Sequence, residues 1–359
     1  MLSRYFEERG IPLQDVAGSG RTPRAFSQPQ AEHIATRRHA GLFDFSFMGC
    51  WQITGRDSIR FLENLQTRDV RALKPGTLSY TLLCNSDGSV LNDATVWRHG
   101  PDHFWLFTGR RTDRSHIIEH ARGYDVAISE MADNYAAIAI QGPQSHAILA
   151  RVLSEYGFAD LRYFGFYKTR LCSHIAWVGR LGYSGELGYE MIVPAEAAVE
   201  VWERIRADGE SEWMVECGFD AANSLRVESG YILFSQELTE PTTPYELGLG
   251  RLVALHRGAF IGCEALLALH RHLPRRKLLG IKFERIAAVV PEARSAAAAK
   301  VTSQCFSPTF DCHLALGFVE CADASLGRIV YTQDARRGRV VRLPFYDPAR
   351  SLPRKLHLG

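Results

Sequence analysis

The sequence predicts an α+β protein of two or three domains that ends in a small β-rich domain. A chain of 359 residues is too long for one ordinary hydrophobic core. Strand-like and helix-like segments alternate from about residue 30 to Pro274, without a glycine-rich phosphate loop. After Pro274 the apolar runs are short and are punctuated by proline and glycine, which is typical of a compact β domain.

The first 55 residues change from polar to strongly apolar. The opening 30 residues are polar and are predicted to be irregular, with "GSGRTPRAFSQPQ" as an exposed loop, whereas residues 30 to 40 have helical spacing. The stretch "GLFDFSFMGCWQITG" at 41 to 55 alternates as a single strand does, with a glycine that indicates a bulge. The next segment, "RDSIRFLENLQT", places its apolar side chains on one face of a helix: Ile59, Phe61, Leu62 and Leu65.

Later segments continue the alternation. "HFWLFTG" and "DVAISEM" are predicted strands on either side of the helix "DRSHIIEHARGY". "YAAIAIQGPQSHAILARVL" predicts strand, turn and helix, and "CSHIAWVGRLGYSGELGYEMIVP" predicts two strands around a glycine-rich turn. "AEAAVEVWERIRADG" is an amphipathic helix that ends at Gly209. "HLALGFVEC", "GRIVYTQD" and "RGRVVRLPFYD" predict the short strands of the last domain.

The stretch "YTLLCNSDGSVLNDATVWRHG" predicts a β-hairpin around the turn "NSDG", with a carboxylate in its second, otherwise apolar arm. Side chains alternate across a strand, so Asp93 and Trp97 share one face. A four-residue loop places Tyr80 opposite Asp93, and a two-residue loop places it opposite Thr95, which is on the same face. Either register therefore groups Tyr80, Asp93 and Trp97 around one spot.

Two interpretations of that spot stay open. An acid among aromatic faces suits a flat ring that is cationic or carries amines. The alternative is an aspartate that is solvated on an exposed face or bonded to a neighbouring turn. The turn "GRLGYSGELGYE" also has two interpretations, because its glycines indicate either a tight hairpin with solvated carboxylates or the close approach of a ligand. In "SLRVESGY", Arg226 and Glu228 are predicted to form a structural ion pair.

Composition and cysteine usage exclude several classes of protein. The chain has 42 basic and 40 acidic residues, a net charge of +2, which gives no electrostatic case for nucleic acid or a membrane surface as partner. The N-terminus "MLSRYFEERG" lacks a signal-type apolar core, and no segment reaches the ~18 uncharged apolar residues of a membrane span. Eight dispersed cysteines, with no C-x-x-C pair and no standard zinc spacing, predict a reduced, cytoplasmic protein without a metal site.

Eight blocks occur in the order seen in one family, the aminomethyltransferase or T-protein of the glycine cleavage system, which the chain resembles from about residue 30 to "LPFYDP". The blocks are "HAGLFDFSFMG", "NLQTRDV", "GTLSYTLLCNSDGSVLNDATVW", "IQGPQSHAIL", "GRLGYSGELGYEMIVP", "LRVESGYILFSQELTEPTTPYELGLG", "FIGCEAL" and "VTSQCFSPTF...LALGFV". The region "ALHRGAFIGCEAL" resembles the transferases and not the iron–sulfur proteins of the same family, which carry K-G-C-Y-x-G-Q-E.

The resemblance implies a three-domain cloverleaf around a central channel in which tetrahydrofolate binds. The expected divisions are a discontinuous folate-binding core at 1–50 and 136–273, an inserted α+β domain at 51–135, and a β-barrel-like C-terminal domain at 274–359.

The resemblance also implies the site residues. Asp93 matches the family's catalytic acid, near the reactive pteridine nitrogens, and Glu190 matches the carboxylate that pairs with the pterin amino edge. Other matched positions line the slot for the pterin and aminobenzoyl rings: Met48, Tyr80, Trp97, Tyr183 and Tyr231. Arg350 or Arg354 matches a C-terminal arginine near the folate, and the spacing does not decide which.

Several positions depart from the family pattern. Phe47 replaces a histidine, Ala222 replaces an arginine, and the third domain looks shortened between Ile281 and Val301. Asn92 replaces the first of two aspartates and, facing away from Asp93, is expected to tolerate change.

The implied function is tetrahydrofolate-dependent transfer of a methyl or aminomethyl group from a small donor molecule, with a lipoyl carrier protein as a possible partner. Two alternatives stay open. One is a folate-dependent O-, S- or N-demethylase, and the other is a folate-binding regulatory protein without catalysis. No dinucleotide fingerprint is present, so a flavin partner would be a separate subunit.

Overall fold

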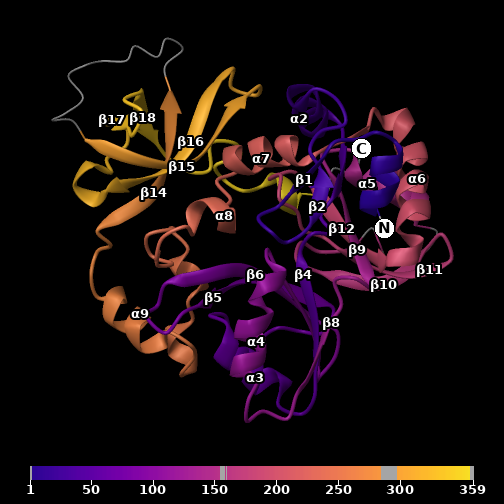
Figure 1. The fold of residues 1–359 in the computed structure, drawn as a ribbon, viewed down its shortest axis with the longest axis horizontal. Helices are drawn as coiled ribbons and strands as arrows, with labels where there is room; N and C mark the ends of the chain where they lie inside the picture. Colours follow the sequence, from indigo (N-terminus) through magenta and orange to yellow (C-terminus); the bar gives the residue numbers. More distant parts are fainter. Residues whose placement is uncertain (1, 154–157, 159, 284–296, 356–359) are drawn as a thin grey trace.

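The computed structural model describes residues 2–153, 158, 160–283 and 297–355, and it has three lobes (Figure 1). Each lobe is built on its own β-sheet, two of them open and the third a closed barrel. A further two-stranded sheet, β1 (Leu13–Asp15) and β2 (Arg21–Pro23), lies near the N-terminus. The α+β class with a small C-terminal barrel is confirmed.

The core lobe contains a six-stranded sheet in the order β10 (Phe166–Leu171), β11 (His174–Gly179), β12 (Gly188–Pro194), β9 (Tyr135–Gln141), β3 (Gly41–Asp44) and β13 (Val215–Glu216). One face is covered by three helices: α1 (Leu2–Glu8), α5 (Ser145–Val152) and α6 (Ala198–Gly209). Side chains on β12 alternate, so Tyr189 and Met191 join this apolar core while Glu190 and Ile192 face the other way. The second face therefore looks toward the inserted lobe and the helix α7 (Phe219–Glu228).

The inserted lobe is a five-stranded antiparallel sheet in the order β5 (Thr77–Cys84), β6 (Val90–Arg98), β7 (His103–Thr108), β4 (Gly49–Thr54) and β8 (Ala127–Glu130). Its outer face is covered by α3 (Ser58–Leu65) and α4 (Arg114–His120), which pack on Ala94 and Val96 of β6. The inner face, which carries Trp97 and Phe107, packs toward the core lobe. Two open sheets thus present their inner faces to each other.

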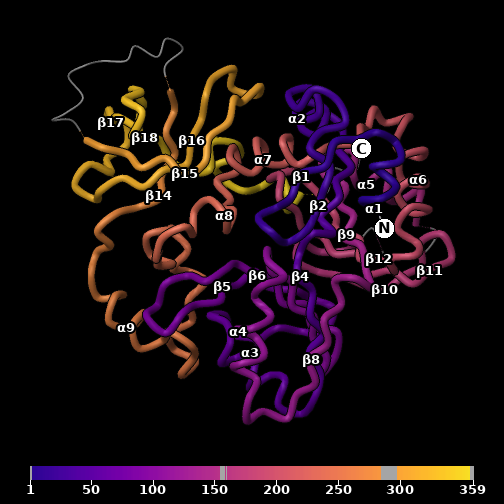
Figure 2. Tube along the Cα trace, viewed as in Figure 1, coloured from indigo at the N-terminus to yellow at the C-terminus, as the bar shows by residue number. Residues whose placement is uncertain are grey.

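The C-terminal lobe is a closed barrel in the order β14 (Arg276–Phe283), β16 (Cys312–Glu320), β15 (Ala298–Ser307), β17 (Ile329–Thr332) and β18 (Arg337–Val341). A long connection with α8 (Phe234–Glu237) and α9 (Cys263–His270) joins it to the core lobe and passes the β5–β6 hairpin (Figure 2). A side chain at Gly88, in the hairpin turn, would meet Leu266 of α9 at 3.2 Å, so turn and helix are in contact. Helix α2 (Pro29–Arg38) also packs on the core lobe.

Short 3₁₀ helices complete the fold: η1 (Arg111–Asp113), η2 (Ala195–Ala197), η3 (Glu210–Glu212), η4 (Gly250–Leu252), η5 (Leu255–Arg257), η7 (Cys321–Asp323) and η8 (Leu352–Arg354). No helix in the described ranges is long and apolar enough to cross a membrane. The eight cysteines are free thiols. The expected shortening between Ile281 and Val301 falls mostly on residues 284–296, outside the described residues.

Two predictions about the first 55 residues are wrong. The opening 30 residues are not irregular, because α1 buries Leu2 and Phe6 against the core sheet. The stretch at 41 to 55 is not one strand. It forms β3 in the core sheet and β4 in the inserted sheet, and the turn between them carries Phe45 to Met48. The expected domain boundary between residues 50 and 51 consequently falls inside β4.

Candidate functional site

A cavity of about 550 Å³ lies where the two inner faces meet, and residues of the long connection and the C-terminal segment complete its lining. This size is within the range of small-molecule binding sites, which is ~300–1,000 Å³. Eight of the nine residues predicted from the sequence line it: Met48, Tyr80, Asp93, Tyr183, Glu190, Tyr231, Arg350 and Arg354.

The β5–β6 hairpin places Tyr80 and Asp93 together, although not in the register expected for a regular four-residue loop. Tyr80 is opposite Thr95, because a bulge between Leu83 and Cys84 shifts the pairing. The shift keeps the side chains of Tyr80, Asp93 and Thr95 on one face of the sheet. The Tyr80 hydroxyl donates a hydrogen bond of 2.9 Å to Oδ2 of Asp93. The expectation of an aspartate solvated on an exposed face is therefore wrong.

Asp93 is a half-buried carboxylate with few partners. Burial raises its pKa to about 6, and the hydrogen bond from Tyr80 opposes that rise. The negative charges of Asp113 and Glu237 add to it. A carboxyl group with such a pKa exchanges its proton near neutrality, as acid–base and charge-stabilising groups do.

Asn92, next to Asp93, is not a freely variable position. Its side chain is fully buried on the outer face and donates to Asp113 Oδ2 at 2.5 Å. Its Oδ1 accepts the backbone N–H of Asp93 at 2.9 Å. Asp113 also pairs with Arg110 at 3.0 Å. An amide suits this place because it donates to Asp113, whereas a second carboxylate would repel it.

Glu190 is the second carboxylate of the cavity. It lies on the inner face of β12, and no hydrogen-bond or ion-pair partner for its side chain is found in the described part of the chain. Burial raises its pKa to about 7. Because an unpaired buried carboxylate is costly, this group indicates a ligand that donates N–H or O–H bonds to it.

Two tyrosine rings form one wall of the cavity. The rings of Tyr183 and Tyr231 are nearly parallel, with centroids 5.9 Å apart. The Tyr183 hydroxyl donates to the Ile232 carbonyl at 2.5 Å, which fixes its ring. A flat ligand inserted between two aromatic faces needs about 7 Å, twice the van der Waals contact distance, so these rings act as a wall on one side.

The C-terminal segment brings both predicted arginines to the cavity. The guanidinium of Arg350 lies 5.3 Å from the Tyr231 ring centroid, and that of Arg354 lies 5.6 Å from the Tyr163 ring centroid. Asp347 accepts the Leu352 N–H at 2.8 Å, which holds the turn between them.

Trp97 does not line the cavity, so that prediction is wrong. Its side chain is 1% exposed, and its ring centroid is 4.9 Å from that of Phe166 in the core sheet. The ring fills the space over Gly179, where an added side-chain carbon would lie 2.3 Å from it. Trp97 therefore joins the inserted lobe to the core lobe. Thr95, which accepts the indole N–H at 3.1 Å, lines the cavity in its place.

Sequence reasoning missed two groups of cavity residues. The first is a set of phenylalanine rings: Phe45, Phe47, Phe107, Phe164, Phe219 and Phe234. Phe47, the replacement for the family's histidine, thus contributes an apolar surface. The second group is Arg68 and Arg251, whose loop positions gave no periodic signal. Ala222, the replacement for an arginine, is buried in α7 and is not among the lining residues.

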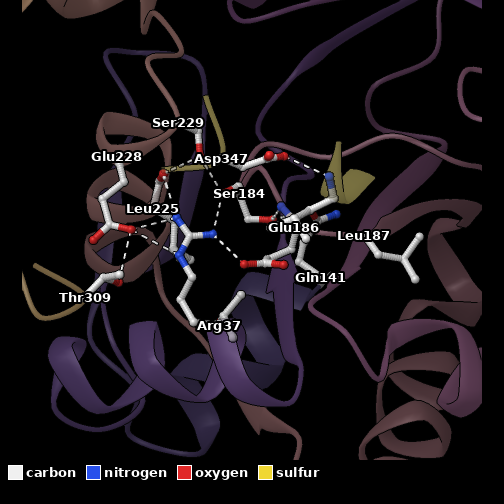
Figure 3. Close-up of polar contacts among 12 residues, drawn as sticks. Arg37, Gln141, Ser184, Glu186, Leu187, Leu225, Glu228, Ser229, Thr309 and Asp347 are labelled. Atoms are coloured by element: carbon white, nitrogen blue, oxygen red, sulfur yellow. Dashed lines mark hydrogen bonds and ion pairs between the residues drawn. The ribbon is translucent and has the colours of Figure 1, made fainter. Parts of the chain in front are cut away.

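A buried ionic cluster behind the cavity fixes the segments that carry its residues (Figure 3). Arg37 of α2 points between two carboxylates, Glu228 at 2.8 Å and Glu186 at 3.0 Å, and also donates to the Ser184 carbonyl at 2.9 Å. The backbone carbonyl of Glu228 in turn accepts hydrogen bonds from backbone N–H groups of the C-terminal segment. The cluster therefore connects the Tyr183 turn, the end of α7 and the segment that leads to Arg350.

The predicted ion pair of Arg226 with Glu228 is wrong. Arg226 pairs with Glu237 at 2.9 Å, and Glu228 pairs with Arg37. The described residues contain no group of three or more histidine, cysteine, aspartate or glutamate side chains that could hold a metal ion.

Comparison with known proteins identifies the fold and the family. The family pattern of the GCVT N-terminal domain matches residues 2–257, and that of the glycine cleavage T-protein C-terminal barrel domain matches residues 276–347. An aminomethyltransferase of Bacillus subtilis is 33% identical over 96% of this chain and 98% of its own length. One of Geobacillus kaustophilus is 34% identical over 93% and 94%. The crystal structure of the glycine cleavage aminomethyltransferase T of Bartonella henselae matches with a TM-score of 0.84 at 27% identity, over 96% of each chain.

The fold and the cavity define an enzyme of one-carbon transfer that uses tetrahydrofolate. Within that class, the chain belongs to the aminomethyltransferase family of the glycine cleavage T-protein. The demethylase and the non-catalytic alternatives gain no support from these relatives. Tetrahydrofolate fits the residues present, since acceptor carboxylates suit its pterin N–H groups, aromatic walls suit its rings, and arginines suit its carboxylates.

Proposed function

We propose that this chain transfers an aminomethyl group from a lipoyl-bearing carrier protein to tetrahydrofolate, with Asp93 beside the reacting carbon. The observation that carries the proposal is the Asp93 carboxylate, which lines the cavity and is bonded only to Tyr80 and to its own backbone N–H among the described residues. The rest of its bonding capacity is free for a ligand. Curated relatives over almost the whole chain carry the name aminomethyltransferase, which supports the same assignment.

Each cavity residue has a role in this proposal. Glu190 accepts the N–H groups at the amino edge of the pterin, because a carboxylate offers two acceptors side by side. Met48 and the parallel rings of Tyr183 and Tyr231 bound the aromatic part of the folate. Arg350 and Arg354 pair with its carboxylates.

Tetrahydrofolate, when bound, supplies the nitrogen atoms that take up the one-carbon unit. Asp93 has a pKa of about 6, so at pH 7 to 8 it is mostly ionised. Its negative charge stabilises the positive charge that develops at the transferring carbon, and burial makes that stabilisation stronger than it is in water. As the C–N bond to tetrahydrofolate forms, the C–S bond to the lipoyl sulfur of the carrier breaks. The Asp93 carboxylate can accept the proton released at the folate nitrogen, and that proton is returned to the leaving thiolate, which departs as a thiol. Tyr80 keeps the carboxylate in one orientation through the 2.9 Å hydrogen bond.

The Asp93→Asn substitution tests the assignment. Asparagine has nearly the same shape but no charge, so tetrahydrofolate should still bind, within about threefold of the wild-type Kd, while turnover falls at least about a hundredfold. Turnover is measured with an aminomethyl-loaded lipoyl carrier protein, by mass spectrometry of the folate product. Binding is measured by calorimetry with tetrahydrofolate.

The matched control is Asp102→Asn, which removes an exposed carboxylate outside the cavity and should leave both quantities unchanged. Turnover by Asp93→Asn that stays within threefold of wild type would refute the role of Asp93. A panel of methylated amines, thioethers and ethers run in parallel tests the donor. Product from one of these, and none from the lipoyl carrier, would contradict aminomethyl transfer.

A further inference from the structure

An ion pair behind the cavity connects one of its walls to the C-terminal barrel. Arg226 of α7 and Glu237 of α8 are both buried, and Arg226 Nη1 lies 2.9 Å from Glu237 Oε2. Neither side chain is among those that line the cavity. Because the desolvation of a buried ion pair offsets much of its attraction, the pair by itself is weak evidence for stability. Its other partners show what else it does.

The pair holds one wall of the cavity, the segment 230–234 that connects α7 to α8. Arg226 donates to the Tyr231 carbonyl at 3.1 Å, near the start of this segment. Glu237 accepts the Leu233 N–H at 2.8 Å, near its end. Both ends of the wall are thus bonded to one ion pair, which keeps the backbone under the Tyr231 ring in place beside the cavity.

The barrel supplies further partners of Glu237 through an irregularity in β15. The register of β15 shifts between Val301 and Ser303, so Thr302 is an extra residue in the strand. Thr302 Oγ1 donates to Glu237 Oε1 at 2.6 Å, and the Ser303 hydroxyl donates to the same oxygen. Ser303 also accepts from Arg226 at 2.7 Å. Successive side chains of a regular strand point to opposite faces, so the bulge is what turns both hydroxyls to the pair.

The charges of the pair act on Asp93 in the cavity. Burial raises the pKa of Asp93, and the negative charge of Glu237 raises it further. Arg226 lies beside Glu237, so its positive charge offsets part of this effect. The other titratable groups near Asp93 are Tyr80 of β5, Asp113 of η1 and Tyr183 of the β11–β12 connection.

We propose that Arg226 and Glu237 are positioning residues for the reaction, which hold the cavity wall to the barrel and balance the charge that acts on the Asp93 carboxylate. Both act through other residues, since neither lines the cavity. The inference rests on the proposed function in one respect, the role of Asp93 in the reaction. It adds a role for the C-terminal barrel, because the hydroxyls of Thr302 and Ser303 hold the Glu237 carboxylate in place.

The pH dependence of turnover tests the proposal with two variants that change the charge in opposite directions. Glu237→Gln removes a negative charge near Asp93, so the acid limb of the pH–rate profile should move to lower pH by at least about 0.3. Arg226→Gln leaves Glu237 without its counter-charge, so the limb should move to higher pH by about as much. The double variant should return the limb close to its wild-type position. A role in folding alone would lower turnover without opposite shifts.

Nuclear magnetic resonance titrates Asp93 directly in protein with ¹³C-labelled aspartate carboxyls, where its signal is identified by its loss in Asp93→Asn. This titration needs no turnover, and its midpoint should follow the acid limb in each variant. Thr302→Val covers the case in which a charge variant does not fold. It takes a single donor from Glu237, so the midpoint should move to higher pH, as in Arg226→Gln.

Glu63→Gln is the matched control. It removes the buried carboxylate that pairs with Arg257 at 3.2 Å, outside the cavity lining, and should leave the titration of Asp93 unchanged. Midpoints that are unchanged, or that move in the same direction in the two charge variants, would overturn the inference and leave the proposed function intact. An unchanged midpoint in Thr302→Val would overturn it where that variant alone folds. Opposite shifts of the Asp93 titration with a fixed acid limb would support the inference and contradict the proposed function.

Discussion

Two pairs of buried or half-buried carboxylates have opposite surroundings in this protein. In the ionic cluster, Glu228 is fully buried, yet its pKa is about 2, because the hydrogen bond with His33 and the charge of Arg37 outweigh the effect of burial. Glu237 is also buried and pairs with Arg226. In the cavity, by contrast, burial raises the pKa of Asp93 to about 6 and that of Glu190 to about 7.

This difference distinguishes the carboxylates that stabilise the fold from those that are available to bind a ligand. Glu228 is satisfied by the protein itself, through Arg37, His33 and the hydroxyl of Thr309. Its removal breaks contacts among three segments. Asp93 and Glu190 face a cavity and are left short of partners, so the protein tolerates an energetic cost at these positions. Each prediction below tests one side of this contrast.

The largest expected effect is on the ionic cluster. Arg37→Ala leaves Glu228 and Glu186 buried without their counter-charge, which should lower the free energy of unfolding by about 3–5 kcal/mol. Urea denaturation followed by circular dichroism measures this. Arg21→Ala removes an exposed partner of Glu7 and should cost less than about 1 kcal/mol. Equal losses in the two variants would mean that the cluster does not stabilise the fold as described.

Glu190→Gln should weaken tetrahydrofolate binding by about tenfold, because the amide replaces one of two acceptors by a donor. In the wild-type protein, the carboxylate must be ionised to accept both bonds, so affinity should fall as the pH drops through about 7. The variant should lose this pH dependence. Calorimetry at pH 6 and pH 8 measures both effects, with exposed Glu196→Gln as control. The same pH dependence in Glu190→Gln as in wild type would exclude Glu190 as its source.

Tyr80→Phe should give the smallest change, about three- to tenfold in kcat/KM near pH 7. The hydrogen bond from Tyr80 lowers the pKa of Asp93, so its loss should raise that pKa above about 6. The acid limb of the pH–rate profile should therefore move to higher pH. Tyr245→Phe removes a hydroxyl bonded to the Leu266 carbonyl outside the cavity and should leave the profile in place. If the acid limb of Tyr80→Phe stays at its wild-type position, that limb does not report the ionisation of Asp93.

Strand parity predicted the central pair of the site from the sequence alone. Alternation of side chains placed Tyr80 on the Asp93 face in either register, and the bulge changed the pairing without changing the face. The alternation of side chains does not predict, however, whether a residue on the correct face reaches the cavity. Trp97 has the correct face but lies beyond the cavity, where the opposite sheet has a glycine that admits its ring. That contact joins residues 97 and 179, and no local pattern encodes it.

Charge partners were the least predictable feature. Residues two apart on a helix do not face each other, so Arg226 and Glu228 point to different partners, in α8 and in α2. The turn from Phe45 to Met48 was missed because apolar alternation continues through it, although the chain moves from one sheet to another. Arg68 and Arg251 are in connections without periodicity, and only the fold brings them to the same cavity as the C-terminal arginines.

The contrast between the two kinds of carboxylate is tested most directly by the free energy of unfolding of Asp93→Asn and Glu228→Gln at pH 8. The folded-state pKa of Asp93 lies above its ordinary value of 3.8, so stability falls as the pH rises from 3.8 to about 6 and the full cost of the ionised form is present at pH 8. Asp93→Asn should therefore gain on the order of 1–3 kcal/mol. The pKa of Glu228 lies below its ordinary value of 4.5, so its charge stabilises the fold at pH 8, and Glu228→Gln should lose about 2–4 kcal/mol. A loss of stability in both variants would contradict the account.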